Sequence, residues 1–129
     1  MDIPWNELID AARRVARFEK FTDMCTAGGV GCVLVSASGK WYTGKCIDAA
    51  CGIGFCAEHA AIGHMVSCGE SQIVMAVAVS EDGQVVPPCG RCREFMMQLN
   101  PLNRQARVLV GNAEEVSLAS LLPHYWFNR

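Results

Sequence analysis

Two cysteines in the segment PPCGRCREF, residues 87–95, are spaced so that their side chains can act together. Cys89 and Cys92 lie three positions apart, and the proline before them predicts the start of a helix. Two thiols in this arrangement suit a disulfide, a redox dithiol or half of a tetrahedral zinc site. The spacing alone does not choose among these three.

A third cysteine stands at the start of another predicted helix, in the segment FCAEHAAI. Cys56 is followed two residues later by Glu58. A catalytic zinc ion takes three protein ligands and leaves a fourth position for water. Thiolates are also stabilised by the positive end of a helix dipole. We therefore predict a zinc site formed by Cys56, Cys89 and Cys92.

The combination of C-A-E at residues 56–58 with P-C-G-x-C-R at residues 88–93 resembles the cytidine deaminase family, in its three-cysteine form. The resemblance extends over most of the chain, through VGCVL at residues 30–34 and LLP at residues 121–123. The string PCGRCR is also similar to blasticidin S deaminase. The resemblance implies a three-layer α/β/α fold with a central mixed five-stranded sheet, zinc as cofactor, and Glu58 as a catalytic residue that is not a ligand.

Hydrolytic deamination of cytosine needs hydroxide at C4, a proton at N3 and a proton on the departing amino group. Zinc makes hydroxide available near neutral pH, and Glu58 is expected to act as general base and then as general acid. Three thiolates and one Zn²⁺ carry a net formal charge of about −1. Similar family members place an arginine directly after C-A-E, but this chain has His59 there. We expect Arg91 or Arg93 to offset the charge.

Histidines are not expected among the ligands, because three thiolates complete the protein part of a catalytic zinc site. The chain has three of them, His59, His64 and His124, and each is interpreted as a packing or surface residue.

Substrate contacts are implied by the resemblance. Backbone N–H groups at Cys56 and Ala57 are expected to face the pyrimidine. Cytidine deaminases carry N-x-E in the loop that binds the ribose, and the aligned residues here begin with Cys46 and end with Asp48. We expect these two residues to lie at the sugar, with fewer hydrogen bonds than the family pattern provides.

An aromatic side chain of the family pocket is also missing, because Gly28 stands in its place. Trp126, in the terminal segment HYWFN, is expected to replace this wall of the pocket. The same aromatic residues are equally typical of a subunit interface.

The function expected from these features is zinc-dependent hydrolytic deamination of cytidine or deoxycytidine to the uracil form, with release of ammonia. A modified cytosine nucleoside such as blasticidin S is the alternative substrate. A different class is a non-enzymatic zinc or redox protein in which Cys46, Cys51 or His64 occupies the fourth position on the metal. The resemblance also implies a homotetramer whose subunits share active sites.

The elements that must position these residues alternate between helices and strands, which predicts one mixed α/β domain over residues 1–129. Helices are expected from Pro4 to before residue 22, over CAEHAAIGHMVSC up to Gly69, over PCGRCREFMMQLN up to Pro101, and over SLASLLP with Ser117 as cap. Strands are expected over VGCVLVSA and WYTGKC around a turn at Ser38-Gly39, over IVMAVAVS and over RVLVG.

Composition excludes several other functions. The chain has 129 residues and a net charge of −2, with no cluster of lysine and arginine, so nucleic acid is not an expected partner. The longest apolar run is too short for a membrane span and the N-terminal segment is acidic, which predicts a cytoplasmic protein without membrane contact. The 51% of hydrophobic residues favours subunit interfaces. Most of the eight cysteines are expected to be reduced, with Cys32 and Cys68 in the core and Cys25 and Cys51 without a special role.

Overall fold

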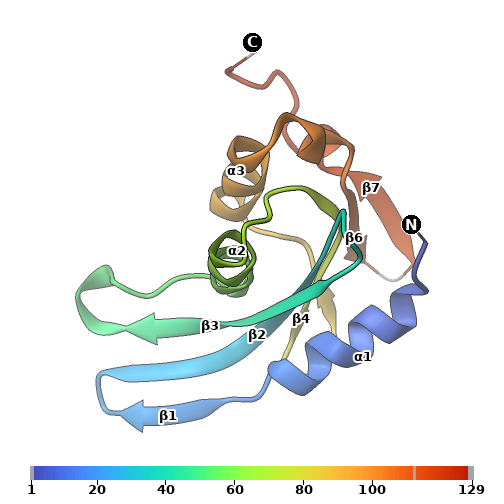
Figure 1. The fold of residues 1–129 in the computed structure, drawn as a ribbon. Helices are drawn as coiled ribbons and strands as arrows, with labels where there is room; N and C mark the ends of the chain where they lie inside the picture. Colours follow the sequence, from blue (N-terminus) through green and yellow to red (C-terminus); the bar gives the residue numbers. More distant parts are fainter. Residues whose placement is uncertain (1, 112, 128–129) are drawn as a thin grey trace.

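The computed structural model describes residues 2–111 and 113–127, which form a mixed sheet between two layers of helices (Figure 1). α1 (Trp5–Val15) lies on one face of the sheet. α2 (Ala57–Ser67) and α3 (Gly90–Leu99) lie on the other. The predicted three-layer α/β/α architecture is therefore confirmed. No helix in the described part of the chain is long and apolar enough to cross a membrane.

The sheet has seven strands instead of the five expected. They are β1 (Glu19–Thr22), β2 (Cys25–Ser36), β3 (Trp41–Ala49), β4 (Ile73–Ser80), β5 (Val85–Val86), β6 (Arg107–Gly111) and β7 (Glu114–Ser117). The order β3-β2-β4-β6-β7 accounts for five, with β4 and β6 parallel and the other neighbours antiparallel.

The two additional strands, β1 and β5, pair with parts of β2 and β4 that extend beyond the neighbouring strand on the same edge. β2 extends beyond β4, so its first residues pair with β1 on that edge. β6 pairs with β4 only at Met75 and Ala76, and β5 pairs with the next part of the same edge, at Ala78 and Val79. Both additions satisfy backbone groups that would otherwise lie on an open sheet edge.

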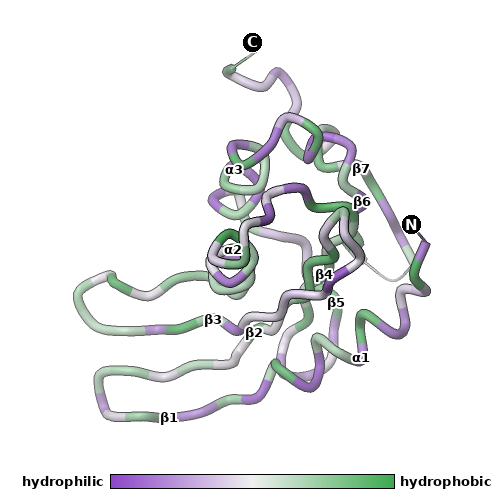
Figure 2. The backbone as a smooth tube through the Cα atoms, in the orientation of Figure 1, coloured by the Kyte–Doolittle hydropathy of each residue, from purple (hydrophilic) through white to green (hydrophobic). Residues whose placement is uncertain are grey.

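Alternating side chains of β2 enter the two separate cores. Cys32 and Leu34 pack in the core that contains α2 and α3, whereas Val33 and Val35 pack against α1. A strand buried on both faces carries apolar residues at successive positions, and this is the pattern seen in the sequence. Figure 2 shows hydrophobic colours along β4 as well, and both colours along the amphipathic α1.

Three predictions about the ends of elements are confirmed. The β2–β3 hairpin turns at Ser38-Gly39, where Gly39 has a φ of +90°. α2 ends just before Gly69, whose φ is +85°. Ser117 caps the following turn, because its hydroxyl accepts a hydrogen bond from the N–H of Ser120 at 3.2 Å.

Three other expectations need correction. The last predicted helix is a single 3₁₀ turn, Leu118–Leu121, because β7 occupies the residues before it. Two further 3₁₀ segments, which are not among these corrections, are Ala50–Gly52 and Pro101–Gln105. As the second correction, α1 ends at Val15 instead of continuing to residue 21, and β1 follows it. Cys68 is exposed at the end of α2, although Cys32 is buried as expected.

Close packing at Gly44 sets the distance between β3 and the first turns of α2. A Cβ atom at Gly44 would lie 2.5 Å from the backbone nitrogen of Ala61 and 2.7 Å from the carbonyl oxygen of Ala57. Only glycine allows so close an approach of helix and strand without a shift. The glycine therefore determines where the start of α2 lies.

Gly44→Ala is expected to lower the free energy of unfolding by about 1–3 kcal/mol, because the added methyl group overpacks this contact. Gly63→Ala is the matched control, since a Cβ atom at this exposed position of α2 meets nothing within 4 Å. The control should raise stability by about 0.5–1 kcal/mol, as alanine is the better helix former. Urea denaturation measures both values, and equal effects of the two substitutions would contradict the proposed contact.

Candidate metal centre and active site

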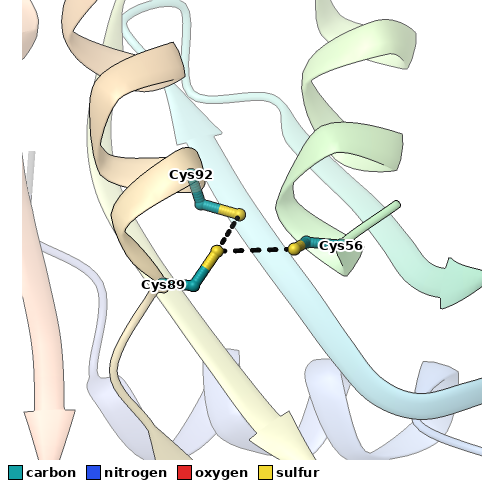
Figure 3. Close-up of side chains that lie close together, drawn as sticks. All are labelled: Cys56, Cys89 and Cys92. Atoms are coloured by element: carbon teal, nitrogen blue, oxygen red, sulfur yellow. Dashed lines mark hydrogen bonds between the residues drawn. The ribbon is translucent and has the colours of Figure 1, made fainter. Parts of the chain in front are cut away.

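Two helix starts bring three thiols together. Cys56 is the N-cap of α2, Cys89 is the N-cap of α3, and Cys92 lies in the first turn of α3. The sulfur of Cys89 is 3.4 Å from that of Cys56 and 3.4 Å from that of Cys92 (Figure 3). All three sulfurs lie within 4.8 Å of one another. Among the described residues this is the only group of three or more potential ligands that could hold a metal ion.

The sulfur cluster fits a zinc ion in both spacing and charge. Sulfurs bound to one tetrahedral zinc at about 2.3 Å lie about 3.8 Å apart, close to the spacing observed. Burial, followed by the charge of Glu58, raises the pKa of the Cys92 thiol well above its usual range. Burial also raises the pKa of Cys56. A divalent cation among the sulfurs would offset this cost and favour the thiolates.

Cys89 differs from the other two thiols. Burial acts to raise its pKa, but hydrogen bonds from the backbone N–H groups of Cys92 and Arg91 and from the neighbouring thiols outweigh burial, so the pKa is lowered. N–H groups of the first helical turn have no acceptor within the helix and are free for such contacts. The start of α3 therefore favours an anionic sulfur at this position.

Glu58 lies beside the sulfur cluster with its side chain almost entirely inside the protein. The residue is 4% exposed, and burial raises the pKa of its carboxyl group, although hydrogen bonds to its own backbone and to Cys92 partly oppose this. A carboxyl group with a raised pKa is suited to take up and release a proton near neutral pH. Its position in the first turn of α2 follows directly from the spacing C-A-E.

A cleft of about 530 Å³ opens next to these residues. It is lined by residues from the start of α2, the loop before α3, and the strands β2 and β3. They are Gly29, Val30, Cys46, Asp48, Gly54, Phe55, Cys56, Ala57, Glu58, Val86, Pro87, Cys89 and Arg91. The cleft thus brings Cys46, Asp48 and Ala57, which were predicted to bind substrate, to the same space as Glu58.

The residues predicted to lie near the sugar and at the missing aromatic wall have two features that differ from the family pattern. The sulfur of Cys46 accepts a hydrogen bond from the N–H of Val30 at 3.3 Å. Gly28 has a φ of +93°, and a Cβ atom there would lie 1.8 Å from the carbonyl oxygen of Arg17. The local backbone therefore excludes any side chain at residue 28, in agreement with the missing aromatic wall.

The two arginines predicted to offset the thiolate charge are placed differently from each other. Arg91 is exposed and lines the cleft. Arg93 donates to the carbonyl oxygens of Pro88 at 2.7 Å and Leu121 at 3.4 Å, so it holds the loop before α3. Among the described residues, no hydrogen bond joins either guanidinium group to a cysteine sulfur.

His59 makes a contact that the sequence patterns did not reveal. Its Nδ1 atom is 3.4 Å from the sulfur of Cys92. Burial and the nearby charge of Arg91 lower the pKa of this imidazole. The available signal was its place directly after C-A-E, where similar family members have arginine. His64 instead lies edge-on to Tyr42, with ring centroids 5.1 Å apart, and His124 is exposed.

Trp126 does not line the same cleft as Glu58 within one chain. Its indole N–H donates to Glu94 at 2.9 Å, and the side chain is 69% exposed. It lines a separate space of about 370 Å³. Tyr125 also donates to Glu94, at 2.5 Å, so the terminal segment is fixed against α3.

Comparison with known proteins identifies the family of this fold and site. Residues 6–109 match the cytidine and deoxycytidylate deaminase zinc-binding region. The chain belongs to this deaminase family. The match covers both helix starts and all three clustered cysteines, and it identifies the chain as a zinc-type deaminase with zinc as its cofactor.

Relatives of this deaminase include two bacterial cytidine deaminases. The protein from Halalkalibacterium halodurans is 33% identical over 97 residues, which cover 73% of this chain and 74% of the relative. The protein from Mycobacterium tuberculosis is 27% identical over 103 residues, which cover 75% and 72%.

Solved cytidine deaminase structures share the fold of this deaminase. The crystal structure from Mycobacterium tuberculosis has a TM-score of 0.82 at 24% identity, covering 98% of this chain and 100% of that one. The structure from Burkholderia pseudomallei has a TM-score of 0.75 at 25% identity, with 95% and 98% covered.

Cys89→Ala is expected to reduce the zinc content of this deaminase from about one ion per chain to a small fraction, because two thiols hold the metal far less tightly than three. Cys68→Ala is the matched control, since this exposed thiol lies outside the cluster, and it should keep full occupancy. Elemental analysis after gel filtration measures the metal. Full occupancy in Cys89→Ala would rule out Cys89 as a ligand.

Proposed function

We propose that the protein hydrolyses the amino group of a cytosine nucleoside, cytidine or deoxycytidine, to give the uracil form and ammonia. The observation that carries this proposal is the position of Glu58, almost fully buried beside Cys56, Cys89 and Cys92 at the wall of an open cleft. Family membership supports the same reaction type. A structural zinc site would have no use for a proton-transfer group at this point.

Cys56, Cys89 and Cys92 would hold the zinc ion. When bound, zinc supplies Lewis acidity that lowers the pKa of a water molecule and makes it a nucleophile near neutral pH. The thiols come from two helix starts, so the helix dipoles help to keep them ionised. Their arrangement leaves one side facing the cleft, where water and substrate can reach.

Glu58 moves the protons in the proposed reaction. Its carboxylate accepts one proton from the attacking water and delivers it to N3 of the cytosine ring. It then takes the proton of the hydroxyl group formed at C4 and delivers it to the amino group, which leaves as ammonia as the C4 carbonyl forms. Each proton taken up is given away again, so the residue ends the cycle in its starting state. The raised pKa of Glu58 suits both directions of transfer.

The first N–H groups of α2 are suited to hold the pyrimidine. Ala57 is buried at the first position of the helix and lines the cleft, where its N–H has no acceptor within the helix. Such a donor can bind a carbonyl or ring nitrogen of the base and orient it toward Glu58. We assign the same role to the backbone N–H of Cys56.

The described residues would leave the fourth position of a zinc ion at the sulfur cluster without a protein ligand. The alternative of a non-enzymatic zinc protein required Cys46, Cys51 or His64 to fill it. The Cys46 sulfur accepts a backbone hydrogen bond, Cys51 is exposed on a different turn, and His64 packs against a tyrosine ring. None of the three belongs to the sulfur cluster. A hydrolytic site is therefore the better interpretation.

The sugar end of the cleft favours a tolerant enzyme. Asp48 is exposed at the rim, and the Cys46 sulfur, a weak hydrogen-bonding group, is already engaged by Val30. Gly28 offers no side chain that could serve as the aromatic wall of the family pocket. These features keep a modified cytosine nucleoside such as blasticidin S as an alternative substrate.

Subunit association is proposed as well, as a homotetramer. Several of the exposed large apolar side chains lie at β1 and its neighbours or in the C-terminal segment. They include Phe18, Phe21, Met24, Ile53, Trp126 and Phe127. Exposed apolar groups of this size are typical of interfaces. In such an assembly, Trp126 would line the cleft of a neighbouring subunit. Light scattering distinguishes a tetramer from a dimer or a monomer.

Glu58→Gln is expected to keep the fold and the zinc content but to lose turnover by about 10²–10⁴-fold, because the amide cannot accept or deliver the proton. Glu7→Gln, on the exposed side of α1, is the control and should match the wild type. The loss of ultraviolet absorbance of cytidine and the release of ammonia measure the rate. Near wild-type turnover in Glu58→Gln would show that another group transfers the protons.

Asp48→Ala is expected to lower kcat/KM for cytidine by about tenfold to a hundredfold if the carboxylate accepts a ribose hydroxyl, since such a bond contributes about 1.5–3 kcal/mol. Asp10→Ala, on α1 across the sheet, is the control. Wild-type kinetics with cytidine, 3′-deoxycytidine and blasticidin S should show only a weak preference for the unmodified sugar. A strong preference would mean that another residue supplies the contact.

A further inference from the structure

His59 connects the two helices that carry the sulfur cluster. It lies in the first turn of α2, directly after Glu58, and its Nδ1 atom is 3.4 Å from the sulfur of Cys92 on α3. The imidazole also packs against the ring of Phe95, with centroids 4.8 Å apart and planes inclined by 45°. These two contacts fix both the position of the ring and the nitrogen that faces the sulfur.

The Cys92 sulfur belongs to the most buried of the three cysteines. Its residue is fully buried, whereas Cys89 is exposed and receives backbone N–H groups at the start of α3. Within the described residues, the guanidinium groups of Arg91 and Arg93 make no hydrogen bond to a sulfur. Among the described residues, Nδ1 of His59 is the one nitrogen in hydrogen-bonding position to Cys92.

A buried thiolate without a donor is costly, because the negative charge is neither hydrated nor shared. Three thiolates also exceed the charge of one zinc ion, and the excess electron density weakens the metal as a Lewis acid. An N–H group directed at one sulfur reduces both problems at once. The carboxylate of Glu58 cannot do this, since an ionised carboxylate only accepts.

We propose that His59 donates its Nδ1–H to the Cys92 thiolate and so tunes the zinc centre as a positioning residue that does not touch the substrate. The effect on turnover rests on the proposed deaminase function, whereas the hydrogen bond itself does not. A neutral imidazole carries its hydrogen on one nitrogen only, so this role requires the Nδ1–H tautomer, with Nε2 free to accept. Partners of this kind typically change metal affinity or activity by about 10–100-fold when removed.

Two substitutions separate donation from packing. His59→Asn retains an N–H donor at about the distance of Nδ1 from the backbone. His59→Leu retains an apolar side chain against Phe95 but has no donor. A role in packing alone predicts that leucine is the better replacement, whereas donation predicts that asparagine is.

The first measurement needs no substrate. Nitrogen-15 NMR of the zinc-loaded wild-type protein should show the Nδ1–H tautomer at His59, and the Nε2–H tautomer would overturn the proposal. In cobalt-substituted protein, the thiolate-to-cobalt charge-transfer bands should move to lower energy in His59→Leu and stay near the wild-type position in His59→Asn. Unchanged bands in His59→Leu at full metal occupancy would also overturn it.

The second measurement concerns turnover of cytidine. His59→Leu should lose about 10–100-fold in kcat with KM nearly unchanged, and His59→Asn should recover most of the loss. Recovery by leucine instead of asparagine would contradict donation. If the wild-type protein does not deaminate cytidine, the proposed function fails, but the tautomer and the cobalt spectrum still decide the hydrogen bond. If His59→Leu does not bind metal, the tautomer of His59 in the wild-type protein alone tests the proposed hydrogen bond.

Discussion

The meeting of two helix N-termini is the constraint on which the rest of this structure depends. Cys56 and Cys89 are both N-cap residues, and their helices must begin within a few ångströms of each other for the sulfurs to come together. The packing of both helices on the sheet and its loops determines how close their N-termini lie. Gly44 lets α2 lie directly on β3, and Arg93 holds the carbonyl of Pro88 in the loop that leads into α3. Small shifts in either helix would separate the thiols.

The ionisable groups at the sulfur cluster are unfavourable in their charged forms unless a cation is bound. Two of the three thiols and Glu58 have raised pKa values, chiefly because burial disfavours their ionised forms. A zinc ion would favour the thiolates, and in the proposed reaction Glu58 is the group that exchanges protons. Binding of the metal therefore contributes to the stability of the folded state, since the unfolded chain has no such cluster. The first-turn N–H groups of both helices act in the same direction.

Much of the site could be read from the sequence because it depends on local spacing. The segments around Cys56 and Cys89 each define a helix start, and C-A-E places Glu58 in the first turn. The apolar runs of β2 and β4 likewise indicated burial on both faces. These features need only a few consecutive residues, so no knowledge of distant contacts was required to predict them.

The features that escaped prediction depend on long-range packing. β1 and β5 exist because neighbouring strands leave open edges, which no local pattern records. Cys68 lies in an apolar sequence but beyond the end of α2, where it faces solvent. The contact between His59 and Cys92 joins residues 33 positions apart. A contact between residues so far apart in the sequence cannot be predicted from local spacing.

The coordination of the metal tests the central claim most directly, because a catalytic and a structural zinc site differ in the fourth ligand. X-ray absorption at the zinc edge of the purified protein should show three sulfur ligands at about 2.3 Å and one lighter oxygen or nitrogen ligand at about 2.0 Å. That ligand should change when a cytosine nucleoside analogue is added. Four sulfur ligands, unchanged by the analogue, would describe a closed structural site and would contradict the hydrolytic role assigned to Glu58.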